Sequence, residues 1–128
     1  MVEANQAWAS AAPVLALGCT SLNFVRNGKP NAAAVHDPGL ASATLTFEAT
    51  ARGLSVHQMI GFVPAKARAE YRIPENVQPL TALAVGYAAD PTTLPEHLKQ
   101  RDLTPRGRKQ VSEFVFSGEW GKASGLME

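Results

Sequence analysis

The sequence predicts a single domain of the α+β class, in which helices pack against a β-sheet. Two continuous apolar runs, PVLALGC at 13–19 and PLTALAVGY at 79–87, are typical of strands covered on both faces. Between them, the alanine-rich segment 37–52 carries apolar residues at helical spacing. The 128 residues are enough for one domain with its own core, so residues 1–128 are expected to form one unit.

The longest predicted helix begins near Asp37 and ends near Arg52. Asp37 is a favourable N-cap, Pro38 suits the first helical position, and Gly53 is expected to end the helix. One stripe consists of apolar residues at helical spacing: Leu40, Ala43, Phe47 and Ala51. Further apolar residues widen this stripe, so we expect the helix to be buried on several sides and to lie at a subunit interface.

Shorter elements complete the prediction. Proline and glycine positions and apolar spacing indicate a helix over 3–12, a strand over 54–60, a helix over 64–71, a loop around 91–95 and a helix over 105–116. The tail 117–128 is too rich in glycine for a helix, yet Trp120 needs a surface to bury against. We interpret the tail as an arm that lies on a partner subunit.

The composition is that of an ordinary globular domain and excludes several classes of function. Apolar residues make up 45% of the chain and charged residues 18%, which argues against disorder. The net charge is only +1, so the composition does not indicate a nucleic acid or a membrane surface as the partner. No apolar run reaches the roughly 20 residues that cross a bilayer. MVEANQAWAS lacks the cationic start of a signal peptide, so the cytoplasm is the expected location. Cys19, the single cysteine, is expected to be buried.

Two segments leave alternatives open when the residues are considered alone. Residues 58–61, QMIG, are typical of a strand followed by a turn, with Met59 and Ile60 in the core. The basic stretch 106–109, RGRK, is either a solvated turn or an anion site, because guanidinium groups near a helix start bind phosphate well. His57 is either a core or interface residue or a ligand contact.

No motif of a side-chain nucleophile, a phosphate loop or a metal site is present, and no second ligand lies at usable spacing from His57. The pair His36–Asp37 has the chemistry of an acid–base dyad, but Asp37 is explained better as a helix cap. We therefore predict no catalytic side chain and no metal ligand.

Several stretches together resemble the C-terminal part of the nitroreductase-like family of FMN-dependent, NAD(P)H-using oxidoreductases. The matching stretches, in order, are NQAWASAAPVLALG, HDPGLASATLTFEATARGL, VHQMIGF, PLTALAVGY and RGRKQVSEFVF followed by GEWG. The resemblance covers nearly the whole chain. It implies a mixed sheet flanked by helices, a homodimer with a long helix at the interface, a C-terminal arm on the partner, and FMN at each end of that interface.

The resemblance also implies which residues bind the cofactor. Residues Gln58, Met59, Ile60 and Gly61 correspond to the segment beneath one face of the flavin ring, where an apolar floor and backbone N–H groups steady the reduced ring. Gly61 would let the backbone approach the ring. Arg106 and Arg108 correspond to a basic pair that contacts the FMN phosphate.

The implied activity is a ping-pong cycle in which NAD(P)H reduces FMN and a nitroaromatic, quinone or similar acceptor then oxidises it. The sequence departs from the family pattern because the arginine-and-serine FMN motif and the first core strand, which open family members, do not occur in it. We therefore expect either a fragment or a shortened relative with an unpaired sheet edge. The alternatives are a non-catalytic dimerisation or binding module, and one half of a split flavoprotein.

Overall fold

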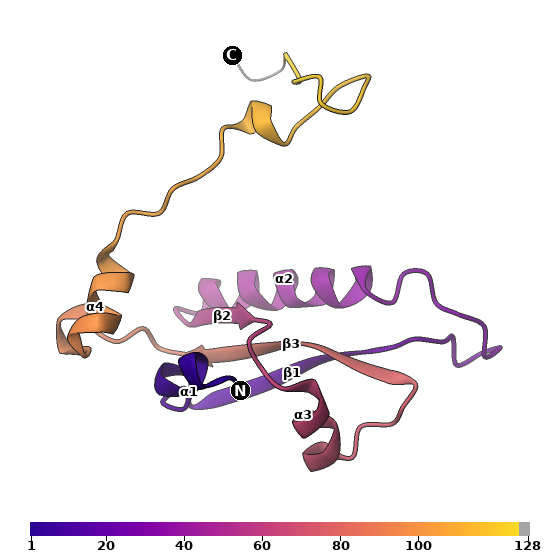
Figure 1. The fold of residues 1–128 in the computed structure, drawn as a ribbon, viewed down its shortest axis with the longest axis horizontal. Helices are drawn as coiled ribbons and strands as arrows, with labels where there is room; N and C mark the ends of the chain where they lie inside the picture. The colour runs from indigo at the N-terminus through magenta and orange to yellow at the C-terminus, as the bar shows by residue number, and fades with distance from the viewer. Residues whose placement is uncertain (126–128) are drawn as a thin grey trace. The chain divides into compact units, whose positions relative to one another are not determined.

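A three-stranded antiparallel sheet organises the first part of the chain in the computed structural model, which describes residues 1–125. The strands stand in the order β1-β3-β2, with bounds Val14–Ser21 for β1, Val77–Gly86 for β3 and Ser55–Met59 for β2 (Figure 1). Both strand pairs are antiparallel. The α+β class is confirmed, and the strands within residues 1–125 include no parallel pair of the kind that a mixed sheet has.

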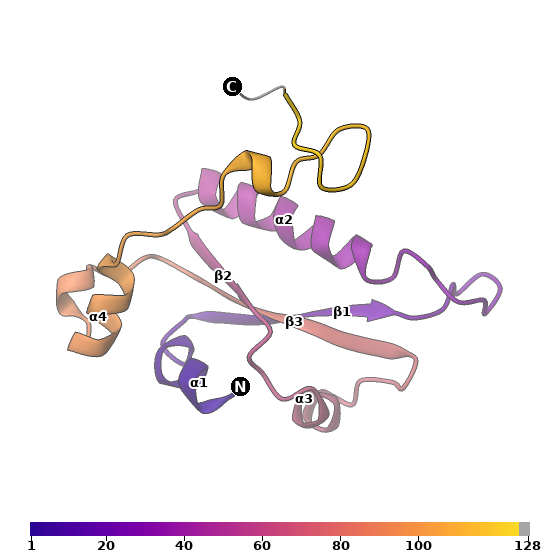
Figure 2. The same cartoon turned by 45° about the horizontal axis from the view of Figure 1, so that its top comes forward.

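Helices lie on both sides of this sheet. Figures 1 and 2 show α2 (His36–Ala51) on one side, and α1 (Glu3–Ala9) and α3 (Pro64–Tyr71) on the other. Helix α3 has the predicted bounds, because Pro64 suits the first turn of a helix. No helix within residues 1–125 combines the length and the apolar character that a membrane crossing requires.

The central strand β3 is covered on both faces, as predicted, since three consecutive residues, Ala82, Leu83 and Ala84, are buried. The same prediction is wrong for β1. Val14 and Leu15 are 52% and 49% exposed, and Cys19 is exposed as well. Strand β1 lies at the sheet edge, so neither its outer edge nor its first residues receive the cover that β3 has.

The start of helix α2 differs from the prediction, whereas its end agrees with it. It begins at His36, and no side chain caps it; Asp37 lies in the first turn, where its carboxylate still favours the helix dipole. The N-cap assignment of Asp37 is therefore wrong. At the other end Gly53 has a φ of +76°, and Leu54 N donates to Ala49 O at 2.9 Å, which forms the expected glycine-based termination.

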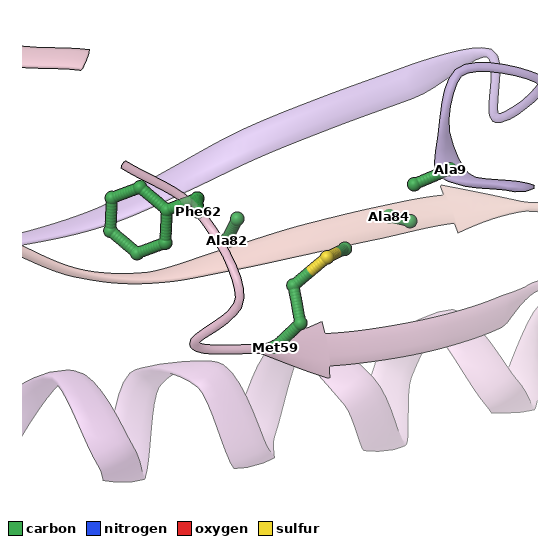
Figure 3. Close-up of a cluster of buried hydrophobic side chains, with 5 residues drawn as sticks. All are labelled: Ala9, Met59, Phe62, Ala82 and Ala84. Atoms are coloured by element: carbon green, nitrogen blue, oxygen red, sulfur yellow. The ribbon is translucent and has the colours of Figure 1, made fainter. Parts of the chain in front are cut away.

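The core between the sheet and α1 is small. It consists of Ala9, Met59, Phe62, Ala82 and Ala84 (Figure 3). Three of these five residues are alanines, and no large side chain in residues 1–125 is fully buried. Met59 belongs to this cluster, so one of the predicted flavin residues has its side chain on the core side of β2.

The chain divides into two compact units, Met1–Ala88 and Ala89–Glu128, and each is described by itself. The second unit contains a 3-10 turn (Pro91–Thr93), α4 (Glu96–Leu103) and a second 3-10 turn (Val111–Glu113). The prediction of a helix over 105–116 is wrong, because the segment between α4 and the second 3-10 turn is irregular. Pro105 and Gly107 both disfavour a helix there. The helix lies earlier, in the stretch after Pro95.

The predicted arm forms a turn closed by the pairing of Phe116 with Ala123. Trp120 packs on Phe116 with ring centroids 5.2 Å apart, and it is 94% exposed. Residues 126–128 of the predicted arm lie outside the described residues. The placement of the arm on a partner subunit stays a prediction.

Candidate functional site

The predicted flavin floor, residues 58–61, lies where β2 ends and the chain turns towards α3. Alternation along the strand separates the side chains of this segment. Met59 is 7% exposed and faces the core, whereas Ile60 is 82% exposed. The prediction that Ile60 belongs to the core is therefore wrong, and the segment presents apolar surface to its surroundings.

Gln58 and Ile60 line a pocket of about 250 Å³ between the start of α2 and the sheet. The other lining residues come from α2, from the residues before it, and from β3: Val35, Pro38, Gly39, Ser42, Leu80 and Thr81. Four of the eight lining residues have aliphatic side chains and three have polar ones, and such a mixture of apolar surface with a few polar groups is usual for a small-molecule site.

Gln58 is held by α2 through its side-chain amide. Its Nε2 donates to Thr46 Oγ1 at 3.0 Å and to the backbone oxygen of Ser42 at 3.4 Å. Ser42 is one of the two buried residues of α2. Sequence reasoning missed Ser42 and Thr46, because the helix also carries Thr44, Glu48 and Thr50 and no local pattern sets these two apart.

Thr81 is a further polar residue of the pocket lining. Its Oγ1 is buried and has no hydrogen-bond partner among the described residues. A Cβ at position 18 would lie 2.5 Å from this oxygen, so the absence of a side chain at Gly18 in β1 makes room for the Thr81 hydroxyl. Sequence reasoning did not identify Thr81, because no local pattern marks it.

The structure gives Gly61 a packing role within the chain. A Cβ on Gly61 would lie 2.2 Å from Asn5 Nδ2 and 3.2 Å from Val2 Cγ2. The carbonyl oxygen of Gly61 accepts hydrogen bonds from Asn5 Nδ2 at 3.1 Å and from the backbone N–H of Val2 at 3.0 Å. The space at Gly61 is therefore filled by the N-terminal segment, and its main-chain role towards a flavin stays a prediction.

The two predicted arginines belong to the second compact unit, whereas residues 58–61 belong to the first. Arg106 and Arg108 are exposed in the irregular segment between α4 and the second 3-10 turn, so the predicted position in the first turn of a helix is wrong. Arg108 Nη1 donates to the neighbouring Gly107 oxygen at 3.1 Å. Neither arginine forms an ion pair within residues 1–125, so both guanidinium groups keep most of their donors for an anion.

The two histidines that the sequence singled out lie outside the pocket. His57 is exposed and packs edge-to-face on Trp8 of α1, with ring centroids 4.6 Å apart. His36 Nδ1 lies 3.4 Å from Asp37 Oδ1, and both side chains are mostly exposed. Within residues 1–125 no cluster of His, Cys, Asp and Glu could hold a metal ion.

Comparison with known proteins gives one relative of uncharacterised function. The chain is 34% identical over 121 residues to a 15.4 kDa protein encoded in the ask 5′ region of Mycolicibacterium smegmatis, and the match covers 94% of this chain and 80% of the relative. No model of a protein family matches the sequence.

Several solved structures of oxidoreductases are similar to the chain in fold. A crystal structure of an oxidoreductase containing FMN superposes with a TM-score of 0.85 at 27% identity, covering 94% of this chain and 62% of that chain. A nitroreductase family protein from Clostridium difficile 630 superposes with a TM-score of 0.62 at 25% identity, covering 85% of this chain and 61% of that chain. A nitroreductase family protein from Streptococcus pneumoniae TIGR4, at 18% identity and a TM-score of 0.64, supports the fold alone; this match covers 89% of this chain and 68% of that chain.

The nitroreductase-like resemblance predicted from the sequence is confirmed, since the chain shares the fold of these nitroreductase-family oxidoreductases. The chain spans 62% and 61% of the lengths of the first two solved chains.

Proposed function

We propose that this chain forms the flavin-binding part of an FMN-dependent oxidoreductase of the nitroreductase type. The observation that carries the proposal is that Gln58 and Ile60, predicted from the sequence as flavin-floor residues, line a pocket between α2 and the sheet. The solved FMN-containing relative supports the same cofactor.

The pocket suits the ring of FMN better than the whole nucleotide. Ligand pockets usually measure about 300–1,000 Å³, and this one has about 250 Å³. Val35, Ile60 and Leu80 offer aliphatic surface to a flat ring. The anionic tail then needs separate contacts, and Arg106 and Arg108 are the residues that we assign to the phosphate, because guanidinium groups bind phosphate bidentately.

Bound FMN would supply the hydride chemistry, and the residues of this chain would bind and orient the ring and limit the access of water to it. We propose NAD(P)H as the electron donor and a nitroaromatic, quinone or similar acceptor as the second substrate. Both would use one cleft in turn, which is a ping-pong order. The lining residues of the pocket include no acid and no base, and the proposal assigns the hydride chemistry to the flavin and none of it to a side chain.

We further propose a homodimer that forms through α2. Leu40 and Phe47 lie on the outward face of this helix and are 57% and 77% exposed. Ser42 and Ala49, on the opposite face, are the buried residues of the helix. An exposed apolar helix face of this kind is expected to pack against a second copy of the chain.

Flavin binding and turnover test the function. The purified full chain should take up about one FMN per chain, and the loaded protein should oxidise NAD(P)H in the presence of a quinone. A preparation that neither contains flavin nor takes up added FMN would contradict the proposal. The exposed face of α2 favours the second candidate function, a non-catalytic dimerisation module, and a dimer without flavin would support that alternative.

A further inference from the structure

Gln58 is the polar side chain of the pocket whose orientation the structure fixes. Thr46 on α2 has a single hydroxyl proton, and that proton is donated to the backbone oxygen of Ser42 at 2.8 Å. Thr46 Oγ1 can therefore only accept from the Gln58 amide 3.0 Å away. The backbone oxygen of Ser42, 3.4 Å from the same amide group, is also an acceptor.

Both partners of the Gln58 amide are thus acceptors, and this settles which end of the amide faces the helix. A reversed amide would place Oε1 against the Ser42 oxygen and would require Thr46 to give up its bond to that oxygen. The NH₂ group consequently faces α2. The amide oxygen Oε1 of Gln58 is therefore directed away from α2, and no described residue donates a hydrogen bond to it.

We infer that Gln58 is a specificity-determining residue that selects ligands carrying an N–H donor on a planar ring, and that Thr46 is its positioning residue. Gln58 lines the pocket and is exposed, so its Oε1 is open to an N–H donor of a ligand as well as to water. The matching chemistry is an imide or primary carboxamide beside an aromatic ring. The inference deepens the proposed function and rests on it, because both the flavin imide and the nicotinamide carboxamide have this chemistry.

Matched pairs of small ligands test the inference by removing only the N–H groups. The first pair is lumiflavin and 3-methyllumiflavin, and the second is nicotinamide and N,N-dimethylnicotinamide. We expect the full-length chain to bind the N–H member of at least one pair about tenfold more tightly, because the methylated ligand leaves the Gln58 oxygen unpaired. The pair that shows this preference identifies whether the flavin or the nicotinamide supplies the donor.

Variants of α2 separate the orientation of Gln58 from simple structural damage. Thr46→Val keeps the side-chain shape but frees the amide to turn, so the preference should fall to about threefold or less. Thr46→Ser keeps the acceptor and should keep the preference. Thr50→Val is the matched control, because the Thr50 hydroxyl makes the same kind of bond to the helix, to Thr46 O at 2.8 Å, without touching Gln58. The ratio of affinities is the readout, since a merely structural defect would weaken both members of a pair equally.

The outcomes distinguish this inference from the proposed function. Equal binding of both members in each pair would overturn the inference and leave flavin binding intact. A preference confined to the nicotinamide pair, with no binding of either flavin, would support the role of Gln58 and contradict the FMN proposal. Absence of binding to all four ligands would overturn both.

Discussion

Replacing Gly61 by alanine tests whether this glycine serves internal packing. The new Cβ would lie 2.2 Å from Asn5 Nδ2 and 3.2 Å from Val2 Cγ2, and the first distance forces the Asn5 side chain to move. Two hydrogen bonds to the Gly61 oxygen are then at risk, one from Asn5 Nδ2 and one from the Val2 backbone. These bonds dock the start of α1 on the turn after β2.

The expected loss of stability follows from those two bonds. A neutral hydrogen bond contributes about 0.5–1.5 kcal/mol to stability, so Gly61→Ala should lower the free energy of unfolding by about 1–3 kcal/mol. Urea denaturation followed by circular dichroism measures this as a lower midpoint at unchanged slope. Gly61→Val should lower it further, because its side chain is larger.

A double-mutant cycle with Asn5→Ala tests the physical cause. Asn5→Ala alone should cost about 1 kcal/mol through one lost hydrogen bond. Adding Gly61→Ala to it should cost little more, since the atom that the new Cβ would strike has been removed. Strictly additive losses, or a Gly61→Ala variant as stable as the wild type, would refute the packing role. FMN uptake by the double variant should persist, because the position 61 side chain points towards α1.

Three further predictions concern the cofactor, the interface and a titrating group. Arg106→Ala with Arg108→Ala should weaken FMN retention by about tenfold or more for each charged hydrogen bond lost; equal retention in equilibrium dialysis would contradict the phosphate assignment. Phe47→Glu should weaken dimerisation by about a hundredfold, measured by analytical ultracentrifugation, because it puts an unpaired carboxylate into the interface. Tyr71→Glu, at an exposed aromatic on the other side of the sheet, should leave the dimer unchanged, and an equal effect of both would argue against α2. Hydrogen bonds from the backbone N–H and the hydroxyl of Thr92 lower the pKa of Asp90. Their stabilisation is present above the ordinary pKa of an aspartate and is lost as the pH falls through the lowered value, so an NMR titration that gives an ordinary pKa would contradict it.

Local signals predicted the elements that depend on local chemistry. The bounds of α3 follow from Pro64, and Gly53 ends α2 because it adopts the left-handed conformation there. The predictions that failed depend on surroundings. The apolar run of β1 reads like that of β3, but only β3 stands in the middle of the sheet. No local pattern distinguishes an edge strand from a central one when both are apolar.

The candidate site shows the same division between local and tertiary information. Residues 58–61 were predicted from a family resemblance, and two of them line the pocket. The partners that complete it, such as Ser42 and Thr81, come from other elements, α2 and β3, whose packing against β2 no local pattern shows. Thr46 was missed because a threonine in a helix has no marked role until the strand beneath it is known. Gly61 was assigned to a ligand because a sequence cannot show that Asn5 fills the same space.

The most direct test of the central claim is an experimental structure of the full chain crystallised with FMN. We predict that the flavin ring lies against residues 58–61 in the pocket beside the start of α2, with its phosphate held by Arg106 and Arg108. A map in which side chains of the protein itself fill that pocket, with both arginines directed into solvent, would contradict it.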